Sequence, residues 1–357
     1  MTFKPMDVTI DKVCRRDLTA LGEIFAHSFR DEVHPEHIKH RIRRINQFYY
    51  LLRPFARISP WIKDLFNFYV IKVRGEMAGF LQVSYLNHQR QLHLDYIAIS
   101  KRFQGQGLGT WVMRKFIQKV ADLGNQDIVL EVKSDNPAHH LYKRLGFSTR
   151  LRILHYERTF GYTNIASASP VVSGLRKVRD ADRSQLYALY LSSVPGYIRA
   201  AIPRDYRFFN PSLFVRHLSL LKNRLMKTNK KEYIVERDKS IIALLEIISY
   251  PAMRHHIISL MVHPDHENLR ASLIKHTLFT LRKQYGYGTI STTIYDDTVI
   301  KQLALEKLRF KRVATYHLML RPAHLKLKRP DCLSYNRYQP PEGKQSKAVA
   351  TSCTYAL

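Results

Sequence analysis

The pattern of hydrophobic and polar residues predicts the same order of secondary-structure elements twice along the chain. Each copy predicts two strands joined by a turn, a third strand, a helix, a fourth strand, a short helix and a last strand. In the first copy these elements occupy residues 68–85, 91–100, 110–124, 128–136, 137–147 and 150–160. In the second copy they occupy residues 232–250, 255–264, 271–286, 289–297, 298–310 and 312–320. We therefore predict an α/β protein of two tandem units, each a mixed β-sheet flanked by helices.

The predicted boundaries follow local composition. The first unit spans residues 1–160 and the second spans residues 175–324, with a small, polar linker over 161–174. Residues 325–357 contain Pro, Lys and Ser without periodicity, so we expect a disordered basic tail. The nearly constant offset between the copies pairs Asp17 with Asp182, Leu21 with Leu186, and Gly146-Phe147 with Arg309-Phe310.

Composition narrows the class of protein. Hydrophobic residues make up 45% of the chain, yet no stretch approaches the roughly 18 uninterrupted apolar residues of a membrane span. The first residues are too polar for a signal peptide, so we expect a soluble, cytoplasmic protein. Cys14, Cys332 and Cys353 lie far apart without metal-ligand spacing, which predicts reduced thiols and no metal site.

The charge is strongly basic. Lys and Arg number 58 against 29 acidic residues, a net charge of +29. This excess predicts attraction to polyanions, namely RNA or the ribosome, an anionic membrane surface or an acidic protein.

A glycine-rich loop, QGQGLG at residues 104–109, connects a predicted strand to a predicted helix. A Gly-rich turn at a helix N-terminus lets several backbone amides surround a phosphate without interference from Cβ atoms. The loop is not a Walker loop, because it lacks Lys-Ser/Thr, and the antiparallel strands before it do not fit a Rossmann opening. Alone it predicts either an anion site or a tight connection.

The surrounding residues resemble the GNAT superfamily of acyl-CoA N-acyltransferases. Gln104, Gly107 and Gly109 are similar to the pyrophosphate signature of that family. Residues 130–147, LEVKSDNPAHHLYKRLGF, resemble its next strand, Asn-Pro-Ala turn and Leu-Tyr-x-x-Leu-Gly-Phe helix. The two motifs occur in register, and the resemblance covers about residues 5–160.

This resemblance implies an N-acetyltransferase that uses acetyl-CoA, or another acyl-CoA, as co-substrate and in which an amine attacks the thioester directly in a ternary complex. It also implies that the strand before the loop and the next strand splay apart around the pantetheine arm. The implied cofactor contacts are Ile97, Ala98, Ile99, Gln104, Gly105, Gln106, Gly107, Leu108, Gly109 and Thr110. Lys101 and Arg102 either add charge to the phosphate site or form a solvated basic face.

The resemblance also implies the catalytic groups. Tyr142 stands at the position of the general acid, although an aromatic packing role is the alternative. Glu131 is one candidate base; His93 and Asp95, on one face of the preceding strand, are two others, and a dedicated base can be absent. Asn136 either contacts the cofactor arm or caps the following helix.

The second copy departs from these motifs. Residues 266–272 replace the glycine loop without a single glycine, and Leu305 stands at the counterpart of Tyr142. We therefore expect the second unit not to bind the cofactor but to shape the acceptor cleft, complete the assembly or dock a partner.

Two basic segments mix Arg and Lys with aromatic residues. Residues 37–65 precede the first predicted hairpin, where the family places its acceptor wall, and residues 204–231 repeat the pattern. Such segments suit phosphate contacts with base stacking or an anionic membrane, or else they form amphipathic helices. The first hypothesis is thus an acetyltransferase acting on a primary amine, with a protein N-terminus or lysine favoured. The alternative is a non-catalytic basic scaffold for RNA, the ribosome, a protein complex or a membrane.

Overall fold

A computed structural model describes residues 7–28, 67–85, 91–124, 126–161, 171–295, 299–325 and 327. The chain forms two compact units, described separately below. Unit 1 contains the residues up to Arg150 together with those from Tyr316, and unit 2 contains Leu151–Thr315. The basic segment 37–65, most of the predicted linker and almost all of the predicted tail lie outside the described residues.

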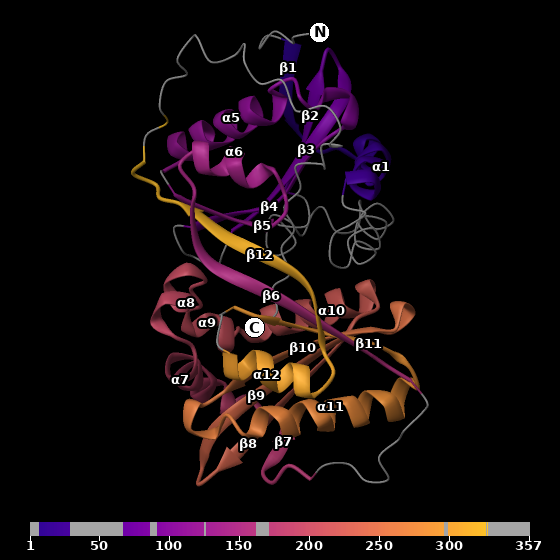
Figure 1. Cartoon of the computed structure of the whole chain (residues 1–357), viewed down its shortest axis with the longest axis vertical. Coiled ribbons are helices and arrows are strands. Elements are labelled where there is room, and N and C mark those ends of the chain that lie inside the picture. Colours follow the sequence, from indigo (N-terminus) through magenta and orange to yellow (C-terminus); the bar gives the residue numbers. More distant parts are fainter. Residues whose placement is uncertain are drawn as a thin grey trace. The chain divides into compact units, whose positions relative to one another are not determined.

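Unit 1 is a mixed sheet with the strand order β1-β2-β3-β4-β5-β12. All neighbours are antiparallel except β4 and β5, which are parallel. The strands are β1 (Val8–Lys12), β2 (Phe68–Val73), β3 (Glu76–Tyr85), β4 (Gln91–Ile99), β5 (Asp127–Lys133) and the end of β12 (Lys311–Arg321). The helices are η2 (Arg15–Asp17), α1 (Leu18–Ser28), η4 (Lys101–Phe103), α5 (Leu108–Asp122) and α6 (Ala138–Arg144). Figure 1 labels α1, α5 and α6.

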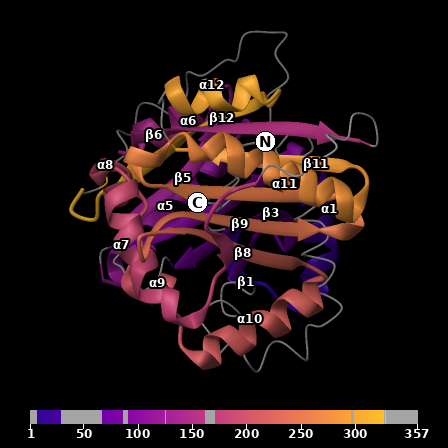
Figure 2. The same cartoon turned by 90° about the horizontal axis from the view of Figure 1, so that it is seen from below.

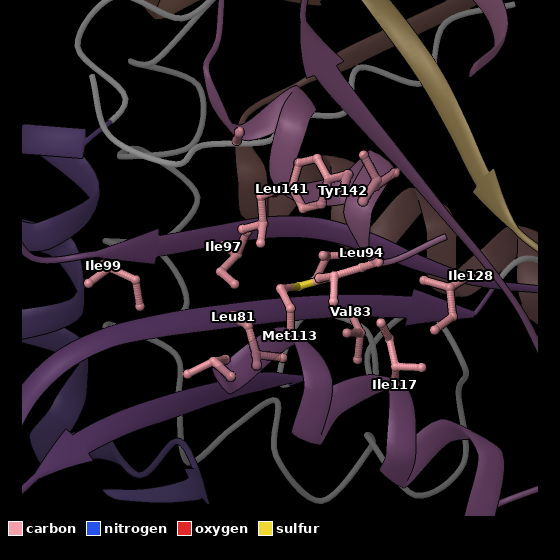
Figure 3. Close-up of a cluster of buried hydrophobic side chains, with 14 of the residues drawn as sticks. Leu81, Val83, Leu94, Ile97, Ile99, Met113, Ile117, Ile128, Leu141 and Tyr142 are labelled. Atoms are coloured by element: carbon pink, nitrogen blue, oxygen red, sulfur yellow. The ribbon is translucent and has the colours of Figure 1, made fainter. Parts of the chain in front are cut away.

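The core of unit 1 forms because α5 presents one apolar stripe to the sheet. Its buried residues recur every three or four positions, as a helix that covers a sheet requires: Leu108, Val112, Met113, Ile117 and Val120. They join one cluster with apolar residues of β3, β4 and β5 and with Leu141 and Tyr142 of α6, as Figure 3 shows.

Unit 2 has the strand order β6-β11-β10-β9-β8-β7, again with one parallel pair, β10 and β11. Its strands are β6 (Ser148–Phe160, entering the unit at Leu151), β7 (Leu175–Lys177), β8 (Asn229–Arg237), β9 (Ser240–Tyr250), β10 (His255–Val262) and β11 (Gly288–Ile294). Its helices are η5 (Asp180–Asp182), α7 (Arg183–Ser193), α8 (Gly196–Ala201), α9 (Tyr206–Phe209), α10 (Leu213–Met226), η6 (Pro251–Met253), η7 (Pro264–His266), α11 (Leu269–Tyr285) and α12 (Val299–Lys307).

Equivalent residues do the same work in both units, which supports the predicted repeat. The Asp17 carboxylate accepts from the Cys14 amide at 3.0 Å, and the Asp182 carboxylate accepts from the Arg179 amide at 2.6 Å. Both carboxylates therefore cap the start of the first helix of their unit. After the short helix, Gly146 and Arg309 both adopt the left-handed conformation, with φ of +89° and +59°.

The last strands of the two copies are exchanged. Strand β6 ends the first copy but pairs with β11 in unit 2, and β12 ends the second copy but pairs with β5 in unit 1. The compact units thus differ from the contiguous predicted ranges at these two strands. The physical reason is that both strands show a similar apolar alternation, so either one can complete either sheet.

Candidate active site

Strands β4 and β5 separate halfway along β4. Their parallel pairing runs only from Gln91 opposite Asp127 to Leu94 opposite Leu130. Beyond that point β4 stays paired with β3 as far as Ile99, while β5 pairs with β12. The backbone of the last residues of β4 is therefore not covered by β5, in the region where an elongated ligand is expected.

A β-bulge lies where the two strands part. Leu94 pairs with Val83 and Tyr96 pairs with Gln82, so Asp95 is an extra residue on β4. Bulges re-aim side chains and are frequent beside active sites. This bulge places Asp95 beside His93, with Asp95 Oδ1 2.9 Å from His93 Nδ1.

A serine completes this polar group. The Ser84 hydroxyl on β3 donates to Asp95 Oδ1 at 2.9 Å. His93 and Asp95 are both buried, so the His93 imidazole and the Asp95 carboxylate are held in a fixed orientation within the sheet. Sequence reasoning selected His93 and Asp95 but missed Ser84, whose place opposite His93 depends on the register of the hairpin.

The glycine loop is tied to the end of β4. The Gln104 side chain donates from Nε2 to the carbonyl of Ile99 at 2.7 Å. Gly105 and Gly107 adopt φ of +75° and +81°, a conformation that side chains with a Cβ rarely adopt. Glycines are thus required by the path of this loop and not merely tolerated.

The loop opens onto the N-terminus of α5. The helix starts at Leu108, and the Trp111 amide donates to the carbonyl of Gly107 at 3.0 Å. The amides of Gly109 and Thr110 precede Trp111, the first amide that donates within the helix, and they carry the positive end of the helix dipole. These groups fit the pyrophosphate of an acyl-CoA.

The two basic residues before the loop are exposed. The Arg102 guanidinium pairs with the Glu76 carboxylate at 2.5 Å and lies 5.5 Å from the Phe103 ring centroid. The backbone carbonyl of Arg102 accepts a hydrogen bond from Gln106 Nε2 at 2.9 Å. Arg102 therefore stabilises the outer side of the loop, and Lys101 is exposed to solvent beside it.

Gly79 on β3 is a structural position beside the site that the sequence reasoning did not select. It pairs with Ile99, and a Cβ added to it would lie 2.3 Å from the carbonyl oxygen of Ala98. Only glycine permits this close approach of β3 to the end of β4. A glycine inside a predicted strand was the available signal.

Tyr142 and Glu131 are both buried in unit 1. Tyr142 on α6 is fully buried and packs edge-on against Phe147, with ring centroids 5.8 Å apart. Glu131 lies on β5 opposite Leu318 of β12, and its exposed fraction is 1%. Tyr142 is thus a core residue, as the packing alternative predicted, and its role as general acid stays a prediction.

Asn136 shapes the turn between β5 and α6. Its Oδ1 accepts from the Ala138 amide at 2.9 Å, and its own amide donates to the Lys133 carbonyl at 2.9 Å. The side chain therefore orders the start of α6, and the contact with the cofactor arm stays a prediction.

The equivalent loop of unit 2 is built differently. The Glu267 carboxylate accepts from Arg270 Nε at 2.8 Å and from Nη2 at 2.9 Å, at the start of α11. Every residue of this loop has negative φ, and an acidic side chain stands where the cradle would be. Leu305 is confirmed as the counterpart of Tyr142, because the carbonyls of both accept an amide from a Phe five residues later, at 3.0 Å.

The described residues show neither a membrane-spanning helix nor a metal-binding cluster. No helix among them is long and apolar enough to cross a membrane. In the same part of the chain, no three His, Cys, Asp or Glu side chains gather in a way that could hold a metal ion.

Comparison with known proteins identifies the family. Residues 26–147 match the family model described as the acetyltransferase (GNAT) family. This segment of unit 1 is therefore a GNAT domain. The match covers the splayed strands, the glycine loop and α6, which are the features of unit 1 described above.

Individual relatives match parts of the chain. Streptothricin acetyltransferase of Streptomyces lavendulae is 33% identical over 86 residues, which cover 24% of this chain and 46% of the relative. An N-alpha-acetyltransferase of Sulfurisphaera tokodaii is 29% identical over 101 residues, covering 25% of this chain and 60% of the relative. The chain thus spans about half the length of the curated relatives that it matches.

A solved structure matches both units. A tandem GNAT protein from the clavulanic acid biosynthesis pathway superposes with a TM-score of 0.63 over 89% of this chain and 99% of its own. The sequences are 10% identical, so the match shows a shared fold of two tandem GNAT units.

Proposed function

We propose that this chain is an acetyl-CoA-dependent N-acetyltransferase whose unit 1 acts on a primary amine, with a protein N-terminus or a lysine favoured. The observation that carries the proposal is the glycine loop at the end of β4, where this strand parts from β5. The names of two relatives support acetyl transfer.

The residues of unit 1 divide the binding between the two ends of the cofactor. The amides from Gly105 to Thr110 would hold the pyrophosphate, because they lie in and after the left-handed glycines at the helix N-terminus. The backbone of Ile97, Ala98 and Ile99, on the part of β4 that leaves β5, would hold the pantetheine arm. The hydrogen bond from Gln104 to Ile99 fixes these two parts relative to each other.

Bound acetyl-CoA would supply an acyl group already activated as a thioester. The chain must then accept a proton from the ammonium group of the substrate, so that the neutral amine can attack the thioester, and it must protonate the leaving thiolate. Asp95 Oδ1 lies 2.9 Å from Nδ1 of His93, and this contact orients the imidazole ring. His93 and Glu131 are therefore the two candidate bases, with Asp95 orienting the first, and Tyr142 is the candidate acid.

The test is a calorimetric titration of acetyl-CoA into nucleic-acid-free full-length protein. Saturable binding to a single site, followed by acetylation of peptides with free N-termini or lysines in preference to polyamines, supports the proposal. Failure to bind acetyl-CoA overturns it. Binding without acetylation of any amine would favour a scaffold that retains the cofactor.

A comparison of His93→Gln with Glu131→Gln identifies the base. A variant that lacks the base should turn over slowly at neutral pH. Its rate should recover at higher pH, where the substrate amine is deprotonated in solution and no longer needs the base. The variant that keeps wild-type turnover is excluded from the proton transfer.

A further inference from the structure

Helix α10 of unit 2 exposes a row of large apolar side chains. Four of them have large exposed fractions: Leu213 66%, Phe214 59%, Leu220 66% and Leu221 51%. Met226 near the end of the same helix is buried and anchors it, and Figure 2 shows α10 near β8. Single exposed apolar residues are ordinary, but four on one 14-residue helix mark a binding surface.

These four residues lie on one face of α10, and Val215, which is 37% exposed, lies outside that face. Leu213, His217, Leu220 and Arg224 follow one another at intervals of three or four residues. Phe214 and Leu221 are seven residues apart and continue the same face by one position. We call these six residues the α10 face.

The α10 face is basic as well as apolar. The sequence of α10 contains no Asp or Glu, and Arg224 and the following Lys227 are both exposed. Arg216, on the flank of the helix, is already engaged by Asp180 and Asn210. The exposed charge is thus entirely positive and complements an anionic partner.

Three classes of polyanion fit the charge, but only one fits the apolar residues. RNA is bound by stacking bases on aromatic or guanidinium groups, and three of the four apolar residues are leucines, which offer no such platform. An acidic protein groove would need a shape that the α10 face does not define. A lipid surface takes leucine and phenylalanine among its acyl chains while Arg and Lys remain at the anionic headgroups.

We propose that the α10 face docks the protein on an anionic lipid surface, lying in the plane of that surface without crossing it. This proposal is independent of the acetyltransferase activity of unit 1. It assigns to unit 2 a function that does not need the cofactor loop it lacks.

The experiment is flotation of the full-length protein with vesicles. Neutral phosphatidylcholine vesicles are compared with vesicles that contain about one third phosphatidylglycerol, at low and high salt. The first variant, Phe214→Ser with Leu221→Ser, removes apolar area and leaves the charge unchanged. The second, Arg224→Gln with Lys227→Gln, removes charge and leaves the apolar area unchanged.

A matched control is available on another helix of unit 2. Val299 and Ile300 on α12 have exposed fractions of 63% and 68%, so Val299→Ser with Ile300→Ser removes a similar exposed apolar area elsewhere. All variants are first checked for an unchanged thermal unfolding midpoint and unchanged acetyl-CoA binding.

The expected result is binding to the anionic vesicles that weakens with salt. The apolar variant should bind at least about tenfold more weakly, and the charge variant about fivefold more weakly for each lost charge. The α12 control should bind like the wild type.

Three results would overturn the proposal. The first is no binding to anionic vesicles, and the second is equal binding by the wild type and the apolar variant, which would show attraction by net charge alone. The third is a fall in molecular mass in solution on introducing Phe214→Ser and Leu221→Ser, which would make the α10 face an interface between copies. If the first result is accompanied by binding of single-stranded RNA that is lost in the same variant, the α10 face is assigned to nucleic acid.

Discussion

The two units share the splayed strands but not the site. In unit 1, β4 pairs with β5 from Gln91 to Leu94, and in unit 2, β10 pairs with β11 from His255 to Ile258, before each pair parts. Only unit 1 continues into a loop with left-handed glycines. The splay therefore belongs to the fold, whereas the loop belongs to the function, and a search for the splay alone would find two sites where the residues support one.

The bulge separates the units as clearly as the loop does. The pairing of β10 with β9 keeps one register from His255 to Val262, so unit 2 has no residue equivalent to Asp95. Ile257, opposite Ile248, takes the position that His93 holds opposite Ser84. Compared with unit 1, unit 2 thus lacks the one residue that carries the carboxylate, and it has other residues at the positions of the two partners of that carboxylate.

The largest expected effect comes from a substitution in the glycine loop, the feature that unit 2 lacks. Gly107→Glu places a side chain and a negative charge at the N-cap of α5, in a left-handed conformation, and should abolish acetyl-CoA binding measured by calorimetry. The control is Asn268→Glu at the N-cap of α11 in unit 2, which should bind acetyl-CoA like the wild type. Wild-type affinity of the Gly107 variant would contradict the assignment of the loop.

The second prediction concerns Tyr142, whose counterpart is Leu305. Tyr142→Phe keeps the ring packed against Phe147 and removes only the hydroxyl. We expect unchanged acetyl-CoA affinity and a turnover about 100- to 10,000-fold slower, as for loss of a general acid. If single-turnover rates of the variant and the wild type agree, Tyr142 has only a packing role.

The third prediction exchanges a pair of equivalent residues in the sheets. Gly79 pairs with Ile99 and Ala243 pairs with Val262 at matching positions of the two units. Gly79→Ala brings a methyl group against the Ala98 carbonyl and should destabilise unit 1 by about 1–3 kcal/mol, with weaker acetyl-CoA binding. Ala243→Gly should cost about 0.5–1 kcal/mol in unit 2 and leave acetyl-CoA binding unchanged. Chemical denaturation with hydrogen exchange locates each loss, and equal losses in both variants would contradict the close approach.

The smallest expected effect is a dependence of stability on pH that arises at His256 of unit 2 and has no equivalent at the matching position of unit 1. Burial lowers the pKa of His256 to about 4, and its counterpart in unit 1 is Leu92. Below about pH 6.5 His256 binds a proton in the unfolded chain but not in the folded chain. The free energy of unfolding therefore falls as the pH drops from 6.5 toward 4. Between pH 7 and pH 5 the loss is at most about 2 kcal/mol.

His256→Leu, which installs the residue of unit 1, should reduce this loss in β10 and β11 as measured by hydrogen exchange at the two pH values. Buried His155, whose pKa is also lowered to about 4, should leave part of the dependence in place. The control His140→Gln changes an exposed histidine of unit 1 and should leave the stability of unit 2 unchanged at both pH values. An unaltered pH dependence in His256→Leu would mean that His256 does not titrate with unfolding.

Local patterns predicted the elements, the repeat and the loop, because each depends on residues close together in the sequence. The pairing of Asp17 with Asp182 and of Gly146 with Arg309 was recognisable from spacing and is supported by equal hydrogen bonds and equal φ signs. The left-handed glycines likewise follow from the loop sequence.

What the sequence could not predict depends on register and on distant pairing. The bulge at Asp95 changes the face of every residue after it, and no alternation rule marks where the extra residue falls. Ser84 joins His93 and Asp95 only once that register is known. The exchange of β6 and β12 depends on which of two similar strands reaches each sheet edge, and neither strand differs enough in pattern to decide it.

The exchanged strands also set the order in which the protein can be completed during synthesis. Strand β5 stays without the partner that begins at Tyr316, although the rest of unit 1 has been synthesised once Arg150 is added. At ordinary rates of about 5–20 residues per second, its edge stays open for roughly ten to thirty seconds. During this interval the nascent chain presents an unpaired strand edge, and a message truncated before β12 would yield a unit that holds the cofactor loop but never closes its sheet.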